Sequence, residues 1–110
     1  MALKLVVRNK LRVLVKGSIA DEKGKQVPFS FALLCKRLSQ TQIQEAQENK
    51  GDLVVDFIER VTEGWEDVLD DAGQPLPFDE DNFAAVMDQA GLPGVCFQAY
   101  MKEVGAIAKN

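Results

Sequence analysis

The first third of the chain alternates between apolar and polar residues with a period of two, which is typical of half-buried β-strands. The alternation runs through residues 11–20 and resumes after Pro28 in residues 29–36. The polar run at 21–25 includes a glycine and suits a tight turn. The residues expected to face inward are Val13, Val15, Gly17, Ile19, Phe29, Phe31, Leu33 and Cys35. The pattern predicts an antiparallel β-hairpin, with residues 3–7 as either a further strand or an extension of the first.

After Ser39 the apolar residues recur every three or four positions, which is the period of a helix. Ser39 and Gln42 have the spacing of a capping box and predict a short helix, with Ile43 and Ala46 as its apolar positions. The strongest helical pattern covers residues 53–69. Its apolar stripe consists of Val54, Phe57, Ile58, Val61, Trp65 and Val68.

Two shorter patterns complete the chain. Proline and glycine mark 70–78 as a loop, and a helix is expected from Asp79 to Gly91. A final helix is expected to begin at Pro93. The aromatic residues expected in the core or at its edge are Phe57, Trp65, Phe83 and Tyr100. The sequence therefore predicts one α+β domain over residues 1–110: an N-terminal antiparallel β-hairpin (1–38) packed on a bundle of about four α-helices (39–110).

Charge is divided unevenly between the two predicted regions. Residues 1–38 contain nine Lys or Arg and two acidic residues, whereas residues 39–110 contain four Lys or Arg and fifteen acidic residues. Either the basic hairpin lies against acidic helices in the same molecule, or basic and acidic faces pair between copies. Because the acidic majority would repel a phosphate backbone, we expect no nucleic-acid binding.

The residue types favour binding over catalysis. The chain has no histidine, the commonest general base and metal ligand. Cys35 and Cys96 fall on apolar faces, and no phosphate-binding glycine motif occurs. The acidic residues at 67–81 lack the spacing of an EF-hand calcium loop. We therefore expect no enzyme activity and no catalytic, cofactor-binding or metal-binding residues.

No apolar run approaches the roughly 20 residues of a membrane span, and no signal peptide is evident, so we expect a cytoplasmic protein.

Several short motifs occur in an order that resembles the tail assembly chaperones of long-tailed bacteriophages. Each motif alone is a common core pattern, and the specific part of the resemblance is their order from about Val13 onward. The motifs are Val15–Ile19, Val27–Ser39, Asp52–Ile58, Gly64-Trp65, Asp70-Asp71, Pro75–Phe78, Asn82-Phe83, Pro93–Val95 and Ala99-Tyr100.

The resemblance implies a function in phage assembly. A protein of this family would bind the tape measure protein in the cytoplasm of the host bacterium while the tail tube polymerises, and would be absent from the mature virion. It would need no cofactor. Two other classes stay open: a small structural or connector protein that remains in the particle, and an acidic inhibitor that mimics nucleic acid.

The candidate partner-binding residues lie on two of the predicted helices. The helix after Ser39 has few apolar anchors, so we expect it to be displaced easily. The final helix has apolar residues away from its main stripe. The candidates are Ile43, Val95, Ala99 and Ala106. They would contact either a helical tape measure protein or a second copy of the chain; alternatively, they are scattered surface residues without a partner.

Overall fold

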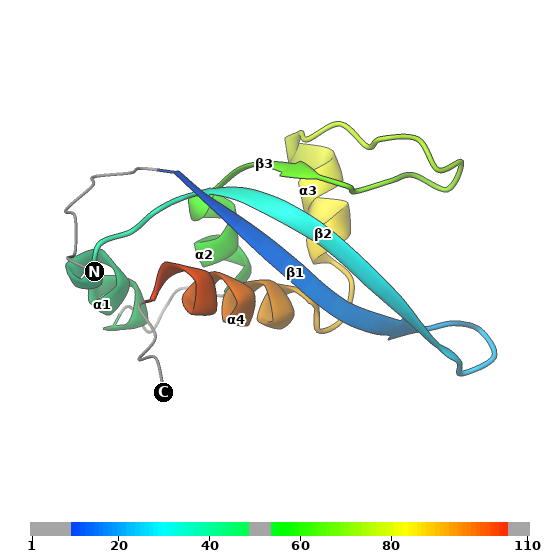
Figure 1. The fold of residues 1–110 in the computed structure, drawn as a ribbon, viewed down its shortest axis with the longest axis horizontal. Coiled ribbons are helices and arrows are strands. Elements are labelled where there is room, and N and C mark those ends of the chain that lie inside the picture. Colours follow the sequence, from blue (N-terminus) through cyan, green and yellow to red (C-terminus); the bar gives the residue numbers. More distant parts are fainter. Residues whose placement is uncertain (1–9, 49–53, 106–110) are drawn as a thin grey trace, which may run out of the picture.

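The computed structural model describes residues 10–48 and 54–105 (Figure 1). It is an α+β fold, as the sequence predicts, with a three-stranded antiparallel sheet in the order β1-β2-β3. Residues 3–7, for which an additional strand was one alternative, and Ala106 lie outside the described residues. The elements are β1 (Lys10–Ala20), β2 (Gln26–Lys36), α1 (Gln40–Glu48), α2 (Val54–Val61), β3 (Thr62–Glu66), α3 (Glu80–Met87) and α4 (Leu92–Val104).

The predicted hairpin is confirmed and pairs over its whole length, from Lys10 opposite Lys36 to Ala20 opposite Gln26. The inward positions nearest the helices are buried as the alternation predicts: Val13, Val15, Phe31, Leu33 and Cys35. At the turn, the Asp21 carboxylate accepts the backbone N–H groups of Lys23 and Lys25, both at 2.9 Å. This local bonding and the left-handed Gly24 (φ 80°) explain why the turn occurs there.

The prediction of a single helix over residues 53–69 is wrong beyond Val61. There α2 ends, and Thr62–Glu66 forms β3, which pairs antiparallel with β2. Thr62 and Gly64 disfavour helix, whereas Thr and Trp favour strands, and the open edge of β2 supplies backbone partners that a continuing helix would not use. The Thr62 hydroxyl donates to the Ile58 carbonyl at 2.6 Å, so the helix-to-strand junction satisfies its own polar groups.

One core lies between the inner face of the sheet and the helices. Phe57 of α2 packs edge-to-face against Phe97 and Tyr100 of α4, with ring centroids 5.3 and 5.5 Å apart. The expectation for the four aromatic residues is confirmed: Phe57, Phe83 and Tyr100 are buried, and Trp65 packs half-buried against the core. Burial of these large side chains is therefore what joins α2, α3 and α4 to the sheet.

The helix starts also follow the sequence signals. Ser39 and Gln42 form the predicted capping box through reciprocal bonds of 2.9 and 3.2 Å. Asp79 caps α3 by accepting the N–H of Asn82 at 2.7 Å. Gly91, in the left-handed region at φ 84°, precedes α4.

We predict that Phe57→Ala lowers the free energy of unfolding by about 3–5 kcal/mol, because it leaves a cavity among the rings of α4. Val54→Ala is the control, since Val54 lies on the same helix but is 42% exposed, and it should cost less than about 1 kcal/mol. Chemical denaturation of both variants measures the difference. Equal, small effects would contradict the packing of α2 on α4.

Candidate protein-binding site

The structure brings together two of the four residues predicted to contact a partner. Val95 and Ala99 lie one turn apart on α4 and line the same shallow groove. Ile43 of α1 is buried, so its side chain is not presented to a partner in this conformation. Ala106 lies outside the described residues.

The groove that contains Val95 and Ala99 lies between α4 and β1, and we call it the α4–β1 groove. In Figure 1, α4 runs beside β1. Strand alternation turns Leu14 and Lys16 away from the fully buried Val13 and Val15. Leu14, which is 39% exposed, adds an apolar side chain to the groove from the strand side. The groove has a volume of about 320 Å³ and is lined by Leu14, Lys16, Val95, Gln98, Ala99, Lys102 and Glu103.

Two ion pairs lie on the sheet and join side chains of β1 and β3. Lys10 of β1 pairs with Glu63 of β3, and Arg12 of β1 lies 3.4 Å from Glu66 of β3. Both pairs therefore join the two edge strands across β2. The hydrogen bond from Lys10 lowers the pKa of the Glu63 carboxyl, which keeps that partner ionised.

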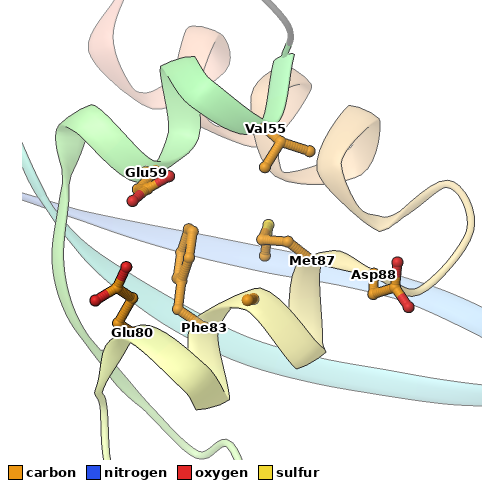
Figure 2. A pocket seen from close by; sticks show the side chains of 7 residues that line it. Val55, Glu59, Glu80, Phe83, Met87 and Asp88 are labelled. Carbon is orange, nitrogen blue, oxygen red and sulfur yellow. The ribbon is translucent and has the colours of Figure 1, made fainter.

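A second groove lies between α2 and α3, and sequence reasoning did not identify it. We call it the α2–α3 groove. Figure 2 shows Phe83 and Met87 projecting from α3 towards Val55 of α2, with the Glu59 and Glu80 carboxylates near Phe83. The groove has a volume of about 250 Å³ and is lined by Val55, Glu59, Glu80, Phe83, Ala84, Met87 and Asp88.

The α2–α3 groove continues into an adjoining hollow of about 380 Å³. The two share Glu59, Glu80 and Phe83, and the hollow adds Thr62, Phe78 and Asp79. Together they form an apolar floor with carboxylates along its sides. Such a surface suits apolar side chains that are accompanied by positive charge.

Aromatic packing holds the Phe78 end of this groove in place. The rings of Trp65 and Phe78 meet edge-to-face at 5.0 Å, and Phe78 contacts Phe83 at 5.9 Å. The Trp65 indole N–H donates to the Leu76 carbonyl at 2.8 Å, which ties the loop before α3 to β3. Asp70 closes that loop by accepting two backbone N–H groups at 2.9 Å. The floor near Phe78 is therefore preformed.

The two thiols are placed for packing. Cys35 and Cys96 are free and buried. Burial raises the pKa of Cys35 to about 11 and that of Cys96 to about 12. A thiol in this state is a poor nucleophile, because the thiolate is the reactive form.

Within residues 10–48 and 54–105, no group of three or more Cys, Asp or Glu side chains is arranged to hold a metal ion. The helices in those ranges are all too short or too polar to cross a membrane.

We predict that both thiols resist alkylation in the folded protein. At pH 8 a thiol with a pKa of about 11 is only about 0.1% ionised, and the fraction rises as pH approaches that pKa. Mass spectrometry after iodoacetamide treatment should show two alkylated cysteines in denaturant and almost none without it. Rapid labelling of the native protein at pH 8 would show that one thiol is accessible and activated.

We also predict that calcium leaves stability unchanged. One oxygen of the Asp70 carboxylate, Oδ1, already accepts two backbone N–H groups, and Asp79 caps α3. Melting temperatures measured with excess chelator and with about 1 mM calcium should agree, because a ligand that binds only the folded state would raise the temperature. A clear rise with calcium would reveal a site among the acidic residues at 67–81.

Comparison of the chain with protein-family models, curated proteins and solved structures finds no significant match.

Proposed function

We propose that this chain is a tail assembly chaperone of a long-tailed bacteriophage. It binds the tape measure protein in the host cytoplasm during tail assembly and is absent from the mature virion. The observation that carries the proposal is the α4–β1 groove, where Val95 and Ala99 meet Leu14 of β1. The order of motifs from Val13 onward supports the choice of client.

The groove matches the geometry of a helical client. Val95 and Ala99 are four residues apart on one helix, so they lie on the same face of α4 and line one side of the groove, where side chains of another helix can pack. Leu14 widens the apolar surface on the strand side, while Lys16, Lys102 and Glu103 keep the rim polar. An amphipathic helix with one apolar stripe suits such a surface.

The small size of the groove suits a contact that has to be released. A single shallow site gives modest affinity, because association must first offset the loss of freedom of both partners. A long client with a repeating apolar stripe provides many such sites, and many weak contacts together hold it while each one stays reversible. Release during tube polymerisation then requires no chemical step.

We predict that Ala99→Glu abolishes binding of the tape measure protein. It places a bulkier, charged side chain beside Val95 in the α4–β1 groove, so an apolar side chain of the client would have to desolvate a carboxylate in order to bind. The assay is co-expression with the tape measure protein of the same phage, followed by measurement of soluble, co-purified client. The unmutated chain should keep the client soluble, and Ala99→Glu should not.

The matched control is Ala85→Glu, the same change at an exposed position of α3 that lines neither groove. Both variants should melt as cooperatively as the unmutated protein. Retained binding by Ala99→Glu would place the client elsewhere on the chain. Failure of the unmutated chain to bind, or its presence in purified virions by mass spectrometry, would contradict the chaperone proposal.

A further inference from the structure

The two elements that form the α4–β1 groove are basic, although the whole chain has a net charge of −4. β1 contains three Lys or Arg residues and no acidic residue, and α4 contains Lys102 and Glu103, so together they carry four basic side chains and one acidic. Nearby charges decide what binds in a groove, because salt screens the more distant ones. A client that reaches this groove therefore meets positive charge.

Two of these four basic side chains are already neutralised by the protein itself. Lys10 and Arg12 each form an ion pair with a carboxylate of β3. Lys16 and Lys102 form no ion pair with any carboxylate in the part of the chain that the structure describes. Both are exposed, and both line the α4–β1 groove. The two ammonium groups at the groove therefore stay available to the carboxylates of a client.

The two lysines lie on opposite walls of the groove, beside its apolar side chains. Lys16 follows Leu14 by two residues, so both side chains are on the same face of β1. Lys102 follows Ala99 by three residues and is its neighbour on the surface of α4. Glu103, which also lines the groove, leaves two positive charges against one negative charge. An apolar stripe seated on Leu14 and Ala99 would therefore have an ammonium group on each side.

The α2–α3 groove has the opposite character. The charged residues that line it are all acidic: Glu59, Glu80 and Asp88. Its apolar floor is also less accessible, since Phe83 and Met87 are only 5% and 4% exposed, whereas Leu14 in the α4–β1 groove is 39% exposed. Charge and accessible apolar surface therefore both direct an acidic, amphipathic segment to the α4–β1 groove.

We propose that the α4–β1 groove selects helical segments whose apolar stripe is bordered on both sides by Asp or Glu, and that Lys16 and Lys102 determine this selection. The apolar side chains of the segment pack on Leu14, Val95 and Ala99, while its carboxylates pair with the two ammonium groups. Ion pairs at an exposed rim add selectivity more than affinity, so the contact stays reversible. The inference rests on the proposed function, because it specifies which segments of the client occupy that groove.

Three designed peptides of about 20 residues test the selection. Each has the same leucine stripe and is held helical by a covalent cross-link on the opposite face. They differ only in whether Glu, Gln or Lys borders the stripe. Fluorescence anisotropy of the labelled peptides measures their dissociation constants. The net charge of the chain, −4, would favour the Lys peptide, whereas the groove favours the Glu peptide.

We expect the Glu peptide to bind at least about tenfold more tightly than the Lys peptide in about 0.1 M salt, and about 1 M salt should narrow the difference. The double variant Lys16→Glu, Lys102→Glu should reverse this order. The double variant Lys23→Glu, Lys25→Glu is the control, because it makes the same change in net charge at exposed positions of the hairpin turn that line neither groove. It should keep the order of the unmutated chain.

Two further variants locate the bound peptide. Ala99→Glu should abolish binding of the Glu peptide, whereas Ala84→Glu, at an exposed α3 position that lines the α2–α3 groove, should not. Three results would overturn the proposal: a Glu peptide that binds no more tightly than the Lys peptide, an order that Lys16→Glu with Lys102→Glu leaves unchanged, or binding of the Glu peptide that survives in Ala99→Glu.

Co-expression with the tape measure protein separates this inference from the proposed function. If the double variant Lys16→Glu, Lys102→Glu retains as much client as the unmutated chain, the selection by charge is wrong and the chaperone proposal stands. If the unmutated chain binds the Glu peptide in the groove but retains no tape measure protein, the chaperone proposal fails and the preference of the groove stands. A loss of client with this double variant, but not with Lys23→Glu, Lys25→Glu, supports both.

Discussion

The positions of the other elements depend on the contacts that the Tyr100 side chain makes. Its ring is fully buried beside Phe57, and its hydroxyl donates to the Lys36 carbonyl at 2.8 Å while accepting the Leu38 N–H at 3.2 Å. The end of β2 would otherwise leave these backbone groups without a partner where the chain leaves the sheet. One side chain thus supplies core volume to α4 and fixes where α4 lies against the hairpin. The α4–β1 groove exists because α4 is held at that position.

Most of the fold could be predicted from the sequence because most elements carry their own signal, either in the spacing of their apolar residues or in the residues at which they begin. The hairpin shows an apolar residue at every second position, and α1, α3 and α4 each begin with a recognisable signal: Ser39, Asp79 and the Gly91–Pro93 turn. β3 was missed because Trp65 and Val68 extend the helical spacing of α2. Its strand conformation depends on the free edge of β2, a partner distant in sequence that local pattern does not contain.

The candidate site was predictable in part. Val95 and Ala99 stood out because they fall away from the main apolar stripe of α4, and the structure places both in one groove. Strand alternation predicts an outward position for Leu14, and only the placement of α4 gives Leu14 its neighbours in the groove. The few apolar residues of α1 suggest that Ile43 is available to a partner, yet for the same reason Ile43 is the residue that α1 buries. The α2–α3 groove combines side chains from two helices, so the pattern of either segment alone does not predict it.

The ion pairs that cross β2 have a consequence for behaviour in a crowded cell. A sheet whose edge strands have no neighbouring strand among the described residues is at risk of adding foreign strands and forming aggregates. Lys10 and Arg12 on β1, with Glu63 and Glu66 on β3, place charge along both edge strands. An incoming strand would have to strip water and counter-charges from these side chains before it could pair. The charges along the edge strands therefore discourage indiscriminate β-association.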